Sequence, residues 1–106
     1  MIEEVYRPAF FECDGLGHIN NTRLPEWFER AREPVFDLFS TPGELQNWRL
    51  IVARLEVDFL APIQYGVSVT LKTEISSIGR SSFEVHQTVA QHQVSVARGR
   101  TVLVHY

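Results

Sequence analysis

The chain has 106 residues, of which 44% are hydrophobic and 22% charged, a composition typical of one globular domain and unlike that of a disordered segment. Its formal net charge of −3 argues against a general nucleic-acid-binding protein, which needs excess lysine and arginine to contact phosphates. Cys13 is the only cysteine and no apolar run is long enough to span a bilayer, so we expect a cytoplasmic protein without disulfides or membrane association.

The chain begins with a predicted strand and a polar loop. Residues 4–11 mix apolar and charged side chains and favour a strand, with Pro8 suiting an edge position in a sheet. Residues 12–21 are mostly polar and include two glycines, which is typical of a tight loop.

Apolar residues at helical spacing predict a helix over residues 22–39 with one broad apolar face. Asn20, Asn21 or Thr22 can cap its start. Pro34 lacks an N–H for the helical ladder, so we expect it to kink the helix or to split it into two segments. The helix is predicted to end over residues 40–43, which include Pro and Gly.

The remaining chain predicts four strands. Alternation of apolar and polar residues indicates strands over residues 51–59 and 67–75, and a third follows over residues 83–89. The last strand, residues 94–106, has a face of small residues that would let a helix lie close to the sheet. Short connections make these strands antiparallel, and one helix must cover a face of their sheet. The sequence therefore predicts a single α+β domain over residues 1–106.

Asp14 lies in the glycine-bearing loop directly before the predicted helix. A helix N-terminus presents unpaired N–H groups and a partial positive charge, which can stabilise the oxyanion formed when a carbonyl is attacked. A carboxylate near that carbonyl can attack it or activate a water. An acyl-transfer site is therefore one interpretation of the loop. The alternative is that Asp14 caps a turn and the glycines only tighten it.

The loop and the helix carry a family resemblance. The run Asp14-Gly-Leu-Gly-His-Ile-Asn-Asn21, followed by Trp27-Phe-Glu-Arg-Ala-Arg32, resembles the Asp-x-x-Gly-His-x-Asn-Asn … Phe-Glu-x-Ala-Arg signature of hotdog acyl-CoA thioesterases, in particular the 4-hydroxybenzoyl-CoA thioesterase-like family. Residues 56–62 and 78–83 resemble later parts of that family in the same order. The resemblance implies a hotdog fold, an antiparallel sheet wrapped around one long central helix. It also implies a homodimer or homotetramer with active sites at the dimer interface.

The resemblance further implies hydrolysis of an acyl-CoA thioester to a carboxylic acid and free CoA, without a cofactor. Asp14 matches the catalytic carboxylate, which acts as nucleophile or general base. Gly17 and His18 match positions beside the helix start, where backbone amides polarise the thioester carbonyl. Ser81 and Ser82 match positions where some members place a hydroxyl near the thioester, contributed by the other subunit.

Three more residues are candidate substrate contacts. Asn21 belongs to the loop motif and can instead serve as a cap or loop tie. Arg98 and Arg100 alternate onto one strand face, where they would meet the phosphates of CoA. The alternative for these arginines is a solvated face or an intersubunit ion pair. The histidines of the predicted strands lack metal-ligand spacing, so we expect no metal site.

Two positions depart from the family pattern and keep other hypotheses open. Glu12 stands where many members have Asp, and Leu24 stands where Tyr is common. These departures leave room for a non-enzymatic hotdog module that binds an acyl or aryl thioester. A hotdog dehydratase is a third hypothesis, but it needs a catalytic Asp–His pair on a different loop, and the sequence lacks that pattern.

Overall fold

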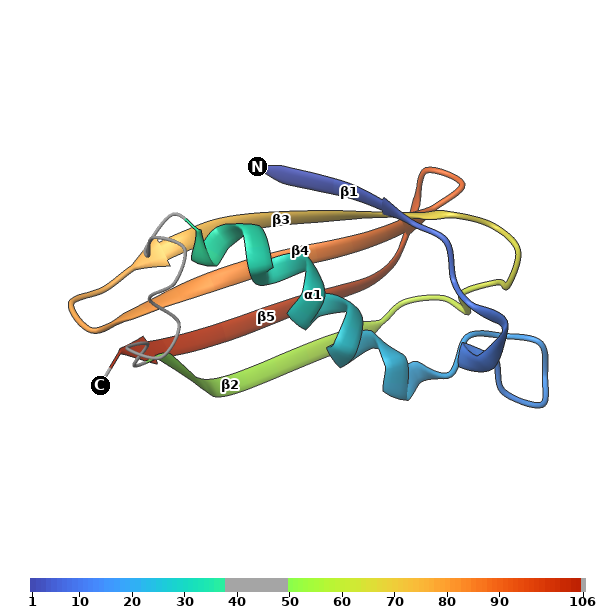
Figure 1. The fold of residues 1–106 in the computed structure, drawn as a ribbon, viewed down its shortest axis with the longest axis horizontal. Helices are drawn as coiled ribbons and strands as arrows, with labels where there is room; N and C mark the ends of the chain where they lie inside the picture. Colours follow the sequence, from blue (N-terminus) through green and yellow to red (C-terminus); the bar gives the residue numbers. More distant parts are fainter. Residues whose placement is uncertain (38–49, 106) are drawn as a thin grey trace.

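The structure is a computed structural model that describes residues 1–37 and 50–105. The described residues form one α-helix, α1 (Leu24–Phe36), and one sheet. The strands of the sheet are β1 (Ile2–Tyr6), β2 (Leu50–Phe59), β3 (Val69–Ile78), β4 (Ser82–Gln91) and β5 (Val94–His105). The sheet has five antiparallel strands in the order β1-β3-β4-β5-β2, and α1 lies across one face of it (Figure 1). Within the described ranges no helix is both long and apolar enough to cross a bilayer.

The first strand is shorter than predicted. The prediction of a strand over residues 4–11 is wrong beyond Tyr6, where β1 ends, and the later part forms a 3₁₀ turn, η1 (Phe10–Glu12). Pro8 lies buried between the two elements and has no N–H to give to a ladder, which explains why pairing stops there.

The helix begins with a 3₁₀ turn, η2 (Asn21–Arg23), before α1 takes over. Asn20 caps this turn by accepting a 2.9 Å hydrogen bond from the Thr22 N–H. Capping by one of the residues predicted for this role is thus confirmed.

Pro34 does not split the helix, contrary to one of the two outcomes predicted for it. The helix runs through Pro34 as one segment to Phe36. Ala31 and Val35, on either side of Pro34, are both buried against the sheet, and this packing holds the last turn in place. The predicted continuation of the helix to residue 39 is wrong at Asp37, which follows the helix end at Phe36. The predicted stop at residues 40–43 lies outside the described residues.

The four later strands are confirmed, and their pairing shifts register at three places, one each in the β2–β5, β3–β4 and β4–β5 pairs. The predicted unbroken alternation over residues 51–59 is wrong at Ala53, because β2 has a bulge between Val52 and Arg54. A bulge adds one residue to a strand and so changes which neighbours share a face. Val52 pairs with Leu103 on β5, which is buried in the core.

The core lies between α1 and the inner face of the sheet. On β5 the predicted small-residue face is confirmed, because Gly99 lies directly beneath the fully buried ring of Phe28. The larger of two core clusters contains these buried apolar residues: Ile19, Leu24, Trp27, Phe28, Ala31, Ile63, Val69, Leu71, Val89, Val96 and Ala97.

Buried polar side chains also tie the helix to the sheet. Gln87 on β4 donates a 2.9 Å hydrogen bond to the Phe28 carbonyl and a 3.1 Å bond to the Thr73 hydroxyl. Arg32 donates to Gln87 at 3.4 Å and to the Thr101 hydroxyl at 3.2 Å. Burial lowers the pKa of Arg32, and its Nε has no hydrogen-bond partner among the described residues. These contacts fix the distance of α1 from the sheet, and so also the position of its N-terminal end.

Candidate active site

Residues 13–19 form a loop that is closed at its base, directly ahead of the helix. Cys13 and Ile19 pair as an isolated antiparallel bridge. One step further in, the Asp14 N–H donates a 2.8 Å hydrogen bond to the His18 carbonyl. The loop therefore holds the two candidate side chains, Asp14 and His18, on adjoining backbone.

The carboxylate of Asp14 is fixed by the loop itself. Its Oδ1 accepts a 2.8 Å hydrogen bond from the Leu16 N–H, the geometry of an Asx turn. Gly17 has φ of +82°, in the left-handed region that favours glycine, and this conformation closes the turn. The Gly17 N–H donates a long 3.3 Å bond to the Asp14 carbonyl. Asp14 and His18 are both exposed.

Most backbone amides at the start of the helix already have partners. The Thr22 N–H bonds the Asn20 side chain, and the Arg23 N–H bonds the Asn20 carbonyl at 3.0 Å. The Leu24 N–H bonds a carbonyl of the preceding turn, and Pro25 has no N–H. None of these four residues therefore offers an unpaired N–H, and what the helix start presents at this point is the positive end of its dipole.

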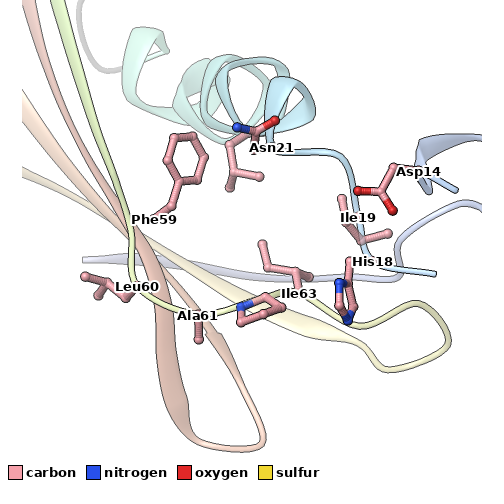
Figure 2. Close-up of a pocket in the computed structure, with 10 residues that line it drawn as sticks. Asp14, His18, Ile19, Asn21, Phe59, Leu60, Ala61 and Ile63 are labelled. Atoms are coloured by element: carbon pink, nitrogen blue, oxygen red, sulfur yellow. The ribbon is translucent and has the colours of Figure 1, made fainter. Parts of the chain in front are cut away.

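A pocket of about 410 Å³ opens between this loop and the end of β2. Figure 2 shows Asp14 and His18 on one side of it and Phe59 and Leu60 on the opposite side, with Asn21 at the helix start. The rest of its wall is apolar and includes Ile19, Leu24, Pro62 and Ile63. The pocket thus combines one carboxylate, one imidazole and one amide in an apolar frame, the composition of a small-molecule site.

The pocket wall after β2 is tied both to the loop and to β4. The Ile19 N–H donates a 2.8 Å hydrogen bond to the Ile63 carbonyl. The buried Gln91 side chain accepts from the Gln64 N–H at 2.9 Å and donates to the carbonyls of Gln64 and Val67, both at 3.0 Å. The side-chain amide of Gln91 therefore makes the backbone hydrogen bonds that a neighbouring strand would otherwise make with residues 64–67.

Of the site residues predicted from the sequence, the structure brings Asp14, His18 and Asn21 to one pocket, with Gly17 in the same loop. The two predicted serines lie elsewhere in the chain. Ser82 begins β4, whose other end carries Gln91 beside the pocket wall. The ten residues of β4 make nine steps of about 3.3 Å, which place Ser82 roughly 30 Å from Gln91. The substrate-binding roles of Ser81 and Ser82 stay predictions.

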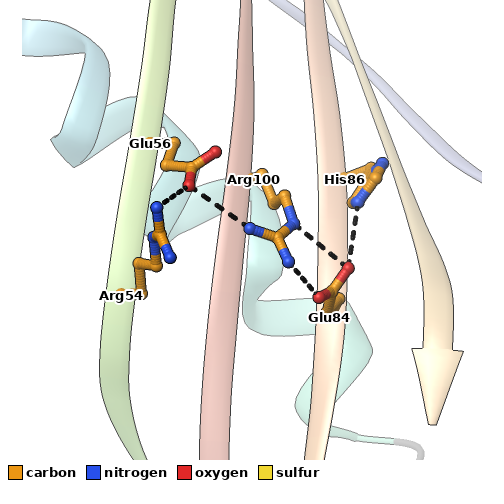
Figure 3. Close-up of polar contacts among 5 residues, drawn as sticks. All are labelled: Arg54, Glu56, Glu84, His86 and Arg100. Carbon is orange, nitrogen blue, oxygen red and sulfur yellow. Dashed lines mark hydrogen bonds and ion pairs between the residues drawn. The ribbon is translucent and has the colours of Figure 1, made fainter.

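The two predicted arginines lie on the outer face of the sheet and are paired within the chain. Figure 3 shows Arg100 of β5 bonded to Glu84 of β4 and to Glu56 of β2, the latter at 3.3 Å. Arg98 donates a 2.8 Å hydrogen bond to Asp58. Hydrogen bonding by Arg100 lowers the pKa of Glu84 in spite of partial burial. Neither arginine lines the pocket, and their contacts to CoA stay predictions.

Glu12 is a residue near the site whose role the sequence patterns did not predict, beyond its departure from the family motif. Its side chain is buried and accepts hydrogen bonds from Trp27, Tyr6 and Ala9. Burial raises its pKa, but these three hydrogen bonds and the charge of Arg23 together outweigh burial and lower the pKa below the ordinary value. The sequence did hold a sign of this role, because Glu12 directly follows Phe10 and Phe11. A carboxylate buried among aromatic residues needs hydrogen-bond donors around it.

Comparison with known proteins gives the family. Residues 9–106 match the family described as the thioesterase-like superfamily. A predicted thioesterase from Bacillus stearothermophilus has 39% sequence identity and a TM-score of 0.92, over 98% of this chain and 78% of that chain. A thioesterase from Thermus thermophilus, solved with coenzyme A and Zn, has 35% identity and a TM-score of 0.87, over 98% and 82% of the two chains.

A curated relative agrees with these structures. The 1,4-dihydroxy-2-naphthoyl-CoA hydrolase of Synechococcus sp. (strain RCC307) is 29% identical over 100 residues, which are 87% of this chain and 76% of that protein. In the described part of this chain, no three His, Cys, Asp or Glu side chains gather as a metal site would require. The chain therefore belongs to the thioesterase-like superfamily, a family of thioester hydrolases, and has the hotdog fold that its loop motif predicts.

Proposed function

We propose that the protein hydrolyses an acyl-CoA thioester to a carboxylic acid and free CoA, with Asp14 as nucleophile or general base. The observation that carries this proposal is the placement of an exposed, oriented carboxylate in an apolar pocket at the start of a helix. Relatives of this chain are named as CoA-thioester hydrolases, which supports CoA esters as the substrate class.

The hydrogen bonding of Asp14 suits attack or base catalysis. The Leu16 N–H holds Oδ1, and within the described part of the chain Oδ2 accepts no hydrogen bond. One oxygen therefore orients the carboxylate while the other faces the thioester carbon or takes a proton from the attacking water. In the general-base route, water forms the new C–O bond as the C–S bond breaks, and Asp14 passes the proton it took from the water to the leaving CoA thiolate. In the nucleophilic route, Asp14 forms the C–O bond as the thiolate leaves, and a water then hydrolyses the resulting anhydride to the carboxylic acid, supplying the proton for the thiolate.

The loop amides support stabilisation of the oxyanion. The bond from the Gly17 N–H to the Asp14 carbonyl is 3.3 Å, longer than an ordinary N–H···O bond, so a substrate oxygen can compete for this donor. The His18 N–H is the second candidate donor, next in the chain. The helix dipole adds partial positive charge on the same side of the pocket, where an oxyanion gains most.

We also propose that the site is completed by a second copy of the chain paired along β2. This strand is an edge of the sheet and exposes apolar side chains: Ile51 50%, Val52 50%, Leu55 39% and Phe59 52%. Long apolar edges of this kind are usually covered in native proteins. Burial against an identical edge is the arrangement that the family resemblance implies.

Antiparallel pairing of two β2 strands accounts for the distant serines. The Phe59 end of β2 borders the pocket, and the pairing would set it beside the Ile51 end of the partner's strand. Within one chain Ile51 pairs with Val104, and Val104 pairs with Ser82. The same pairing therefore carries Ser82 of the partner subunit toward this pocket, which supports a role in the partner's site.

The test is release of free thiol from acetyl-, hexanoyl-, palmitoyl-, benzoyl-, phenylacetyl- and 1,4-dihydroxy-2-naphthoyl-CoA. We expect selective release by the unaltered protein and a loss of at least about a hundredfold in kcat in Asp14→Asn and Asp14→Ala. Asp37→Asn, which changes an exposed carboxylate at the other end of α1, is the matched control. Full activity in both Asp14 variants would overturn the assignment, and tight ester binding without thiol release would favour a binding module.

A further inference from the structure

The buried carboxylate of Glu12 has no part in the chemistry proposed for Asp14. It is 3% exposed and accepts hydrogen bonds from the Trp27 Nε1–H at 2.7 Å and from the Tyr6 hydroxyl and the Ala9 N–H, both at 2.8 Å. These donors come from three different places: α1, β1 and the turn before η1. Hydrogen bonds to a charged acceptor are about twice as strong as neutral ones, so this carboxylate is a firm junction.

The backbone of Glu12 also holds the loop that carries Asp14. Its carbonyl accepts a 2.8 Å hydrogen bond from the Asn20 N–H, directly before the helix start. The bridge between Cys13 and Ile19 begins at the next residue. Both ends of the loop therefore meet at Glu12, whose side chain in turn meets the helix through Trp27.

We propose that Glu12 is a positioning residue, whose ionised carboxylate fixes the Asp14 loop against the start of α1 by tying the base of the loop to Trp27 and Tyr6. This inference rests on the proposed function of Asp14. It concerns the position of the Asp14 carboxylate, because Glu12 does not line the pocket.

The partners of Glu12 cannot turn away from it. The Trp27 side chain is 3% exposed. The Tyr6 ring meets Trp27 edge-on, with centroids 5.0 Å apart and planes at 62°. The guanidinium of Arg30 lies over the Tyr6 ring, with its Cζ 5.4 Å from the ring centroid. Because both rings are packed, a change at position 12 has to be taken up by the loop.

Only an ionised carboxylate satisfies all three donors. Oε1 accepts from Tyr6 and Ala9, and Oε2 accepts from Trp27. A glutamine has one acceptor oxygen and one NH₂ group, so either orientation turns the NH₂ toward a fixed N–H, of Trp27 or of Ala9. A buried N–H that loses its acceptor is costly, so Glu12→Gln should displace the loop base while preserving side-chain volume.

The first measurement is the steady-state kinetics of Glu12→Gln on the preferred CoA ester, at a temperature where the variant is fully folded. We expect kcat to fall by about tenfold to a hundredfold while KM changes by less than about threefold, since a small displacement of a reacting group acts mainly on the chemical step. Glu33→Gln, which changes an exposed carboxylate of α1, should leave both constants unchanged.

The second measurement is a double-mutant cycle with Trp27→Phe. Removing the indole N–H removes the donor that would face the glutamine NH₂, so Glu12→Gln should cost less kcat in the Trp27→Phe background than in the unaltered protein. Equal losses in the two backgrounds, or a loss confined to KM, would overturn the proposal. Kinetics of Glu12→Gln identical to those of the unaltered protein would overturn it as well.

The third measurement does not depend on activity. With ¹⁵N-glycine labelling, the amide signals of Gly15 and Gly17 report on the loop, that of Gly79 on the turn between β3 and β4, and that of Gly99 on β5. Glu12→Gln should shift the two loop signals and leave the signals of Gly79 and Gly99 in place. Unmoved loop signals would refute the positioning role even in an active enzyme. If the loop signals shift but the unaltered protein releases no thiol, the positioning role of Glu12 is supported and the proposed thioesterase function is refuted.

Discussion

The ring of Phe28 lies against the backbone of Gly99, so closely that a methyl group at position 99 would come within 2.9 Å of the ring. Phe28 is fully buried in the middle of α1, and Gly99 is in β5 at the centre of the inner face of the sheet. This contact brings the helix near the sheet and so sets the depth at which the helix start meets the pocket.

Gly99→Ala should therefore destabilise the fold. Because Phe28 is enclosed, the added methyl has to displace the helix or the strand, and we expect a loss of about 1–3 kcal/mol in the free energy of unfolding. Urea unfolding measures this loss. Gly15→Ala is the matched control, because a Cβ there meets nothing within 4 Å. Equal stability of Gly99→Ala and the unaltered protein would contradict the close contact.

Stability should fall in acid, in part through Glu12. The folded-state pKa of Glu12 is lowered, so its stabilising contribution is complete above the unfolded pKa and is lost as pH falls through the folded-state value. We expect the melting temperature to decline below about pH 4.5, the ordinary value for a glutamate. Glu12→Gln should flatten this decline. Glu84→Gln, whose parent carboxylate pairs with Arg100 near the surface, should have a smaller effect that added salt removes.

Pairing through β2 predicts an assembly-deficient variant. Leu55→Lys would set two like charges near the centre of the paired edges, so we expect a shift from dimer toward monomer and a loss of thioesterase activity. Light scattering after size exclusion measures the mass. Val5→Lys is the control on the opposite edge strand, since Val5 is 73% exposed. A Leu55→Lys protein of unchanged mass and activity would exclude this interface.

Phe59→Ala should change which acyl groups are preferred. Phe59 forms the pocket wall opposite Asp14, and truncation widens the space for an acyl chain or ring. We expect kcat/KM for bulky esters to rise relative to acetyl-CoA by about tenfold, the scale of apolar pocket discrimination. Phe10→Ala removes an exposed ring that does not line the pocket and should leave the ratio unchanged. A ratio that moves equally in both variants would place acyl recognition elsewhere.

Local patterns were enough to predict the helix, the later strands and the grouping of Asp14 with His18. Helical spacing, two-residue alternation and the loop motif are all properties of short windows of sequence. The role of Glu12 was not predictable in this way, because its donor Trp27 is 15 residues away and is brought close only by the fold. The buried Gln87 resembled any outward polar residue of a strand for the same reason.

The exposed edge of β2 makes the single chain prone to misassembly before it pairs with a second copy. A ten-residue strand whose outer side pairs with no strand of residues 1–37 or 50–105 can accept an extended segment that offers hydrogen bonds, including unfolded copies of other proteins. The surface that would complete the enzyme is therefore also its main route to misassembly. When this chain is dilute and other unfolded chains are in excess, its edge meets a proper partner late, and we expect the yield of native protein to fall in favour of mixed aggregates.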